Sequence, residues 1–207
     1  MIYLPNQNMS FCIWVDCDEV LSETLDELLK LPPLKDKWIK KSDVTSYELS
    51  AVKKIWMTLD EAINLFFSFF ESSEYWQTQP VSGAYEKLYE LKEAGHVLFV
   101  VTARNKPYEK QTKERVETHF PWIFSDFLFM NQYTENEVPK SQLCKDKGIQ
   151  VLIDDSVRNI YDMNWVWMPG FLLDKPWNQW VEDSELLHRV YSRDEIDLEK
   201  LFKSISI

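Results

Sequence analysis

Residues 11–21 read FCIWVDCDEVL, and this stretch decides the fold that we expect for the chain. It opens with five apolar residues rich in β-formers, and it then sets Asp16 and Asp18 two positions apart. A continuous apolar run of this length is typical of a strand buried on both faces. Because alternate side chains of a strand point to the same side, the two carboxylates would point roughly together if the extended geometry persists. Adjacent carboxylates repel each other unless a divalent cation lies between them or one takes a proton, so the stretch indicates either a site at a strand end or a solvated acidic turn.

The composition of the chain limits the class of protein. With 207 residues, of which 45% are hydrophobic and 14% aromatic, the chain is long enough for one α/β domain, or for a core with a small inserted domain, and it is not disordered. A formal net charge of −11 argues against long nucleic acid or an anionic membrane surface as a partner. The three cysteines, Cys12, Cys17 and Cys144, have no metal-ligand spacing and indicate reduced thiols. We find no leader-like segment and no apolar run of membrane-spanning length, so we expect a soluble, cytoplasmic protein; its oligomeric state cannot be read from the sequence.

Strand and helix patterns alternate along most of the chain. Further apolar runs of strand length lie at residues 97–101, 127–130, 150–153 and 170–174. Helical patterns lie between or beside them, at residues 22–30, 85–93, 106–119, 140–147 and 157–163. The last 25 or so residues predict one or two charged surface helices. This alternation predicts an α/β fold with a Rossmann-like, mostly parallel sheet that has helices on both faces.

Residues 31–79 differ from this pattern. They begin with two prolines, continue through a cluster of lysines and contain an apolar run at helical spacing, Leu59–Phe70. We therefore predict a small helical cap at residues 31–79, inserted into a core formed by residues 1–30 and 80–207. The aromatic side chains of the cap are either ordinary core or the wall of a pocket over the site, and the pocket candidates are Trp56, Phe66, Phe67, Tyr75 and Trp76.

Polar side chains end three of the predicted strands. Asp16 and Asp18 follow the first strand, Thr102 ends the second, Asp154 and Asp155 follow the strand at residues 150–153, and Lys140 begins the helix before it. Taken singly, these are an acidic turn, a strand cap and a solvated lysine. Open α/β sheets bind ligands at the carboxyl ends of their strands. The ordered set supplies what phosphoryl transfer through an aspartate requires: a nucleophile, a proton carrier, an oxygen cage for Mg²⁺, and a hydroxyl and an ammonium to hold phosphate oxygens.

This set resembles the haloacid dehalogenase-type phosphatases, and among them most closely the 5′(3′)-deoxyribonucleotidase, or 5′-nucleotidase type C, branch. The resemblance rests on DCDEVL at residues 16–21, VVTAR at 100–104, Lys140, and IDDS at 153–156, and it extends to Pro-Trp-Asn at 176–178. It covers about residues 11–180, and the segment 31–79 matches in position and helical character rather than in residues.

The resemblance implies a role for each matched residue. Asp16 would be the nucleophile that forms an aspartyl-phosphate, and Asp18 the general acid/base. Mg²⁺ would be bound by Asp16, the backbone carbonyl of Asp18 and Asp154, with Asp155 acting through water. The phosphate would be held by Thr102, the N–H of Ala103 and Lys140.

Two positions leave questions that the resemblance does not answer. Lys145 and Lys147 also precede the last motif, so Lys140 is selected on spacing. Glu19 stands where the family most often has glycine, which fits only if the local backbone avoids positive φ.

We therefore expect a hydrolase: a Mg²⁺-dependent phosphomonoesterase, most typical of a 5′-nucleotidase that releases phosphate from (deoxy)nucleoside monophosphates. One alternative within the superfamily is a phosphatase of another small phosphometabolite or of polynucleotide 3′-ends, and the net charge disfavours the polynucleotide. A receiver-like phosphoacceptor also combines acids, a threonine and a lysine on a parallel sheet, but there the lysine comes last, whereas Lys140 precedes Asp154. An inactive binding module that has kept the sheet is a further, non-enzymatic alternative.

Overall fold

The stretch that opens the chain's first motif forms the central strand β1 (Cys12–Val15) of a six-stranded sheet with the order β3-β2-β1-β4-β5-β6. The computed structural model describes residues 10–164 and 166–205; the ends of the predicted core, residues 1–9 and 206–207, lie outside the described residues. Every strand pair is parallel. The other strands are β2 (Val97–Thr102), β3 (Phe124–Phe129), β4 (Val151–Asp154), β5 (Gly170–Leu173) and β6 (Leu187–Val190). Because β1 lies between β2 and β4, the order of the strands reverses at β1, where open α/β sheets bind their ligands.

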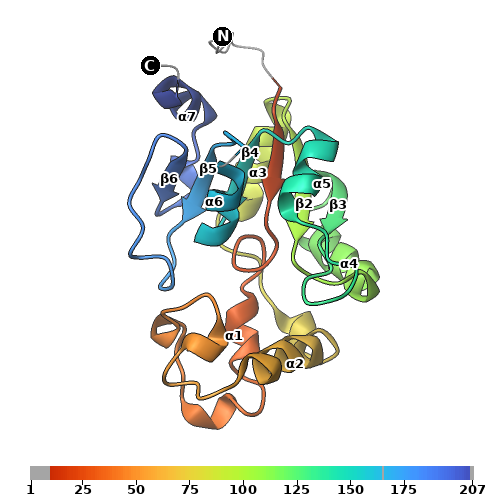
Figure 1. Ribbon diagram of the computed structural model, residues 1–207. Helices are drawn as coiled ribbons and strands as arrows, with labels where there is room; N and C mark the ends of the chain where they lie inside the picture. The colour runs from red at the N-terminus through yellow and green to blue at the C-terminus, as the bar shows by residue number, and fades with distance from the viewer. Residues whose placement is uncertain (1–9, 165, 206–207) are drawn as a thin grey trace.

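Helices cover both faces of the sheet, as the alternation of patterns predicts (Figure 1). On one face, Ile13 and Val15 of β1 share a buried apolar cluster with α3 (Ala84–Glu93), α4 (Glu109–His119) and α7 (Leu198–Ile205). On the other face, Trp14 packs in a cluster with α5 (Lys140–Lys147) and α6 (Val157–Asn164). Successive side chains of a strand alternate between faces, so the continuous apolar run of β1 fits a strand covered on both sides. The predicted α/β fold is confirmed.

The sequence prediction differs from the structure at two strands. The end of the chain was expected to be helical, which is wrong for the edge strand β6; its sequence, Leu-His-Arg-Val, has polar residues in the middle and lacks the apolar run that marked the inner strands. Strand β3 begins at Phe124, three residues earlier than the run from residue 127 indicates, because Ser125 and Asp126 interrupt the apolar pattern.

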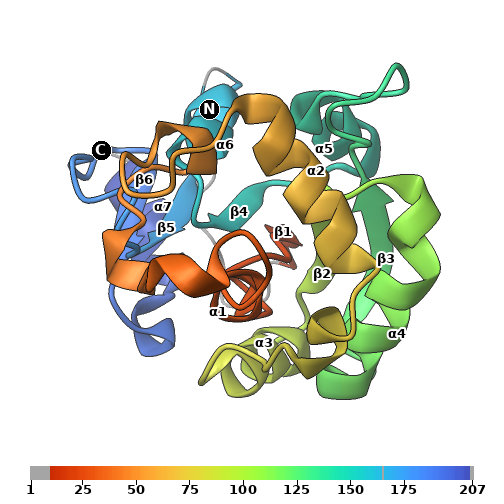
Figure 2. The same ribbon diagram turned by 90° about the horizontal axis from the view of Figure 1, so that it is seen from below.

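A third apolar cluster gathers the residues between β1 and α3. It unites α1 (Thr24–Leu28), α2 (Leu59–Phe70) and four short 3-10 turns, Lys35–Lys37, Lys41–Asp43, Leu49–Ala51 and Glu74–Gln77. Helix α2 begins at a capping box, in which the Thr58 hydroxyl accepts from the N–H of Glu61 and the Glu61 carboxylate accepts from the N–H of Thr58. Figures 1 and 2 show α1 and α2 grouped at the end of the sheet toward which the arrow of β1 points.

Two antiparallel linkers connect this cluster to the core. The N–H of Glu23 donates to the carbonyl of Gln79 at 2.8 Å, and the N–H of Val81 donates to the carbonyl of Leu21 at 2.9 Å. Helix α1, which the sequence division assigned to the core, packs within the cluster instead. We therefore propose that residues 24–79 form the cap as one unit, with its two connections held together by these hydrogen bonds.

None of the helices within the described ranges, 10–164 and 166–205, is long and apolar enough to cross a membrane.

Candidate active site

The carboxyl ends of β1 and β4 bring three acids together. Asp16 follows β1 directly, and its N–H donates to the carbonyl of Ile153 in β4 at 3.0 Å. Asp154 is the last residue of β4, and Asp155 follows it. One carboxylate oxygen from each of Asp16, Asp154 and Asp155 lies within 4.8 Å of the others, and all three side chains are buried. Acids that are far apart in the sequence therefore form one cluster, because β1 and β4 are neighbours in the sheet.

Lys140 supplies the positive charge beside this cluster. Its Nζ lies 3.0 Å from Oδ1 of Asp16 and 3.4 Å from Oδ2 of Asp154, and it stands 4.4 Å from the centre of the Trp14 ring. Burial alone would lower the pKa of Lys140, but the carboxylates of Asp154 and Asp16 raise it above its ordinary value, so the ammonium stays charged. Of the other two lysines considered, Lys147 pairs with Asp126 at 2.8 Å on the surface and Lys145 is exposed. Lys140 is thus the lysine of this segment that lies at the cluster.

The electrostatics of the acids fit a bound cation. Burial raises the pKa of Asp16 to about 7, against the opposing charge of Lys140. Burial and the neighbouring Asp154 and Asp16 hold the pKa of Asp155 well above its usual range. One lysine does not compensate three buried carboxylates, and carboxylate oxygens are the ligands that hard divalent cations such as Mg²⁺ prefer. The residues present therefore fit a divalent metal centre.

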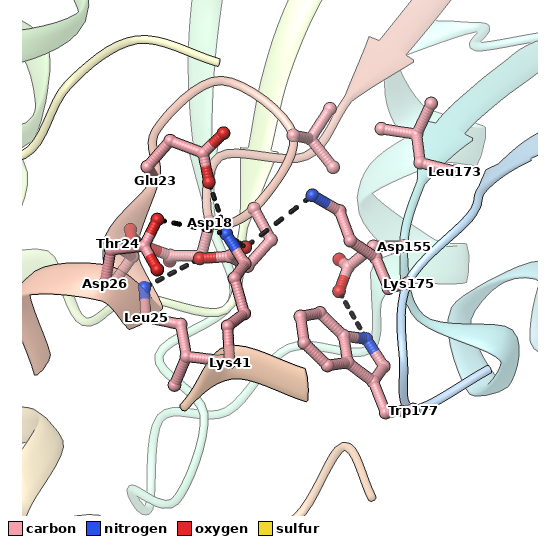
Figure 3. Close-up of polar contacts among 12 residues, drawn as sticks. Asp18, Glu23, Thr24, Leu25, Asp26, Lys41, Asp155, Leu173, Lys175 and Trp177 are labelled. Atoms are coloured by element: carbon pink, nitrogen blue, oxygen red, sulfur yellow. Dashed lines mark hydrogen bonds and ion pairs between the residues drawn. The ribbon is translucent and has the colours of Figure 1, made fainter. Parts of the chain in front are cut away.

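Hydrogen bonds hold two of these acids in place. Asp154 accepts from the N–H of Ser156 at 2.7 Å and from Nδ2 of Asn159 at 3.0 Å. Asp155 accepts from Nε1 of Trp177 at 2.8 Å, and Figure 3 shows the indole and the carboxylate facing each other. Trp177 belongs to the Pro-Trp-Asn stretch of the sequence comparison, so the contact gives that stretch a physical role. Partners of this kind orient the carboxylates that a cation would use.

Asp18 faces a different partner. The guanidinium of Arg104 donates to both carboxylate oxygens of Asp18, from Nε to Oδ2 at 3.0 Å and from Nη2 to Oδ1 at 2.6 Å. The hydroxyl of Thr24 also donates to Oδ1, at 2.5 Å. Burial by itself would raise the pKa of Asp18, but the charge and hydrogen bonds of Arg104 bring it below the ordinary value, and Asp18 is held ionised. The expected coordination of a cation by its backbone carbonyl stays a prediction, as does its role as acid and base.

The predicted phosphate-binding residues lie at the end of β2. Thr102 is its last residue and is fully buried, and its hydroxyl oxygen accepts from the N–H of Arg104 at 3.3 Å. Since β2 pairs with β1 in parallel, Thr102 and Ala103 lie at the same edge of the sheet as Asp16. Their roles in binding phosphate remain predictions.

The backbone conformation of Glu19 differs from the one that we expect from the sequence. Its φ is +62°, so the left-handed backbone that we expected this chain to avoid is present. That conformation costs a residue with a side chain about 1–2 kcal/mol. The carboxylate is buried, and it accepts from the N–H of Leu25 at 2.6 Å and pairs with Lys41 at 2.6 Å and Lys175 at 3.6 Å. These contacts tie the loop after β1 to the cap and to the segment after β5, which offsets the strain.

A cavity of about 160 Å³ lies between the cap and the acids. Asp18, Ala103 and Asp155 line one side, and apolar side chains of α2, including Phe66 and Phe67, line the other. Three of the aromatic candidates do not border it. Trp56 is 88% exposed, Trp76 is 45% exposed, and Tyr75 is buried with its hydroxyl accepting from Nη1 of Arg104 at 3.1 Å.

The sequence reasoning assigned no role to Arg104 or Trp14. Arg104 was visible as the last residue of the quoted second motif, and its place two residues after a strand-end threonine was the available signal. Trp14 carried no such signal, because an aromatic side chain inside a buried strand is ordinary core.

Comparisons with known proteins agree with this geometry. The family model described as 5′ nucleotidase, deoxy (Pyrimidine), cytosolic type C protein matches residues 9–201. A Bacillus cereus protein named "Putative nucleotidase" is 31% identical over 83 residues, which are 40% of this chain and 43% of that protein, so the match spans less than half of that relative.

Solved structures share the fold. A "predicted phosphatase" from Clostridium acetobutylicum has a TM-score of 0.64 at 16% identity, over 95% of this chain and 98% of that one. A haloacid dehalogenase-like family protein from Streptococcus pneumoniae has a TM-score of 0.59 at 12% identity, over 90% and 96% of the two chains. At these identities the structures establish the haloacid dehalogenase-like fold alone. The family model covers nearly the whole chain, and on that match the chain belongs to the family of 5′ nucleotidase, deoxy (pyrimidine), cytosolic type C proteins.

Proposed function

We propose that the chain is a Mg²⁺-dependent phosphomonoesterase that releases phosphate from (deoxy)nucleoside monophosphates through an aspartyl-phosphate on Asp16. The observation that carries the proposal is the convergence of Asp16, Asp154 and Asp155 within 4.8 Å, with the Lys140 ammonium 3.0 Å from Asp16. A nucleophile, a cation cage and a phosphate-binding charge then occupy one strand edge, as phosphoryl transfer needs. A cation held by the three acids would neutralise charge on the phosphoryl oxygens.

The chain's own residues would perform two displacements. A carboxylate oxygen of Asp16 attacks phosphorus, the bond from phosphorus to the leaving oxygen breaks, and that oxygen takes a proton from Asp18. Water then attacks the aspartyl-phosphate and gives a proton to Asp18 while Asp16 is released. Thr102, the N–H of Ala103 and Lys140 hold the phosphoryl oxygens in both steps.

The contact with Arg104 sets a condition on this sequence. Arg104 holds Asp18 ionised, which is the state that accepts the proton of water. The first step needs Asp18 protonated, so its pair with Arg104 has to loosen when the substrate binds.

The cavity and the family both support this substrate class. Phe66 and Phe67 offer faces on which a nucleobase could stack, and the cavity is mostly apolar, as a base-binding pocket would be. The family description names nucleotidases and a cytosolic location, and Cys12, Cys17 and Cys144 are all free thiols, which supports a cytoplasmic enzyme.

A phosphate-release screen tests the proposal. Wild type, Asp16→Asn and the surface control Asp126→Asn are assayed with nucleoside monophosphates and sugar phosphates, with Mg²⁺ and with a chelator. We expect Mg²⁺-dependent release from nucleotides by wild type and the control, and none by Asp16→Asn. Undiminished release by Asp16→Asn would remove the mechanism, whereas release from sugar phosphates alone would keep the mechanism and replace the substrate.

A further inference from the structure

One loop of the cap, residues 45–48, lies between two cavities that both reach the strand-end site. The first is the apolar cavity of about 160 Å³ beside Asp18. The second, of about 740 Å³, is more polar and is bordered by Lys140, Ser156 and Asn159. Tyr47 lines both cavities, and so does Ala103, whose N–H belongs to the proposed phosphate site. Tyr47 therefore stands in the wall shared by the two cavities, as does a residue of the proposed phosphate site.

The acids of the site influence the hydroxyl of Tyr47. The side chain is 49% exposed and borders both cavities. Burial, followed by the charges of Asp155, Asp16, Asp154 and Asp18, holds the pKa of the Tyr47 hydroxyl well above its usual value. The raised pKa keeps the proton on the hydroxyl, so that Tyr47 can act as a hydrogen-bond donor.

Tyr133 provides an internal comparison. It also lines both cavities and is 51% exposed. Burial raises the pKa of its hydroxyl, and the charges that act on it are those of Glu48, Arg158 and Glu137. Two tyrosines therefore share the same walls, but the charges that chiefly influence the Tyr47 hydroxyl are those of the four site acids, and those that influence Tyr133 are not.

The cationic side chains of the site already have partners, so Tyr47 would add a hydrogen-bond donor for a phosphoryl group. The Lys140 ammonium is shared between Asp16 and Asp154. Arg104 is engaged by Asp18 and by the hydroxyls of Tyr75 and Thr112. A phosphoryl group that enters beside four carboxylates needs further hydrogen-bond donors, and a neutral phenol supplies one without adding charge.

We propose that Tyr47 is a substrate-binding residue that donates its O–H to an oxygen of the phosphoryl group held beside Asp16 and Lys140. This inference rests on the proposed function and assigns the cap a direct contact with the transferred group, in addition to its contacts with the leaving group. Binding of phosphate would then draw the cap loop onto the core, since the donor comes from the cap and the other phosphate ligands come from the sheet.

Calorimetric binding of inorganic phosphate in the presence of Mg²⁺ tests the contact independently of turnover. Wild type, Tyr47→Phe and the matched control Tyr133→Phe are compared, with thermal unfolding to verify that each is folded. A hydrogen bond to a charged group contributes enough to predict a loss of about 10- to 100-fold in phosphate affinity for Tyr47→Phe. We expect Tyr133→Phe to stay within about twofold of wild type. The same ratio is expected in kcat/KM for a nucleoside monophosphate.

The outcomes separate this inference from the proposed function. Wild type that binds phosphate but shows no hydrolysis would overturn the function, and the affinities of the two variants would still decide the contact. Equal phosphate affinities for Tyr47→Phe and Tyr133→Phe would overturn the contact while the phosphatase stands. Absence of phosphate binding by folded wild type with Mg²⁺ would overturn both.

Discussion

Arg104 is the residue on which the state of Asp18 depends. It is 4% exposed, binds Asp18 through two nitrogens, donates to Tyr75 and Thr112, and stands 4.9 Å from the centre of the Phe70 ring. One side chain thus connects the loop after β1 with the cap and with α4. Because the partners of a buried charge are costly to remove singly, its loss should affect stability as well as catalysis.

We expect Arg104→Met to lower the free energy of unfolding by about 3 kcal/mol at neutral pH. The folded-state pKa of Asp18 lies below the unfolded value, so the stabilisation is present above about pH 4 and is lost as the pH falls through the folded pKa. The difference in free energy of unfolding between wild type and Arg104→Met should therefore become smaller at acid pH. Urea denaturation over a pH series measures it, with Arg158→Met as control, because Arg158 is exposed and lies 4.0 Å from Asp162. Equal deficits for the two variants would contradict the assigned role.

Asp16 predicts the opposite pH dependence. Its folded-state pKa of about 7 lies above the unfolded value, so ionising it in the folded protein costs free energy that increases from about pH 4 up to that pKa. With divalent metal removed by a chelator, we expect Asp16→Asn to be more stable than wild type at pH 8, by about 2 kcal/mol, and similar to it near pH 4. Chemical denaturation at the two pH values measures this difference. A variant that is less stable than wild type at both would show that the acid is not destabilised by its surroundings.

At the scale of the elements, the cap is joined to the core by hydrogen bonds and by charge. Lys41, in the cap, pairs with Glu19 at 2.6 Å and also with Glu23 and Asp26 near α1. We expect Lys41→Met to lower the free energy of unfolding by about 2 kcal/mol, because it leaves the buried Glu19 with the hydrogen bond from Leu25 and only the longer ion pair with Lys175. Lys54→Met is the matched control, since Lys54 pairs with Asp43 on the exposed side of the cap and should contribute less than about 0.5 kcal/mol. If urea denaturation shows the same loss of stability for Lys41→Met and Lys54→Met, the buried ion pair between Lys41 and Glu19 does not stabilise the protein as proposed.

Helix α2 carries the prediction about the leaving group. Phe67 borders the apolar cavity and Trp56 does not. We expect Phe67→Ala to raise the KM for a nucleoside monophosphate by about tenfold, because stacking on a base contributes about 1–3 kcal/mol, and to change the KM for glycerol phosphate little. Trp56→Ala should leave both values unchanged. Steady-state kinetics with the two substrates distinguish a base-binding helix from a cap that only packs, for which Phe67→Ala would affect both substrates alike.

How far the elements could be predicted depended on their position in the sheet. Strands β1, β2 and β4 are covered on both faces, so their apolar runs are continuous and mark them in the sequence. The edge strand β6 has no such run, and α1 shares the apolar cluster of α2, which no local pattern records. The site followed the same rule. The strand-end acids and Lys140 could be located because topology brings strand ends together. Asp18 and Arg104 also follow neighbouring strands, but no local pattern shows that they pair, and the pair Glu19–Lys41 depends on the three-dimensional path of the cap.

At the scale of the whole molecule, the chain is strongly acidic, but two of its cationic side chains are buried at the candidate active site. The net charge is −11, yet Lys140 and Arg104 are both nearly fully buried beside Asp16 and Asp18. A distribution of this kind disfavours extended anionic partners and still allows a single phosphate to be held at the centre. The account therefore depends on one centre that both a cation and a phosphoryl group can enter.

Calorimetric titration of Mg²⁺ tests that centre most directly. The account predicts one Mg²⁺ site in wild type and in the surface control Asp126→Asn, and a site that is lost or strongly weakened in Asp154→Asn, whose folding is verified by circular dichroism. Asp154 is fully buried and its carboxylate contacts Ser156, Asn159 and Lys140, so a loss would report on the cluster itself. Equal Mg²⁺ binding by wild type and Asp154→Asn, or no binding by folded wild type, would contradict the assignment of Asp16, Asp154 and Asp155 to one metal-assisted site.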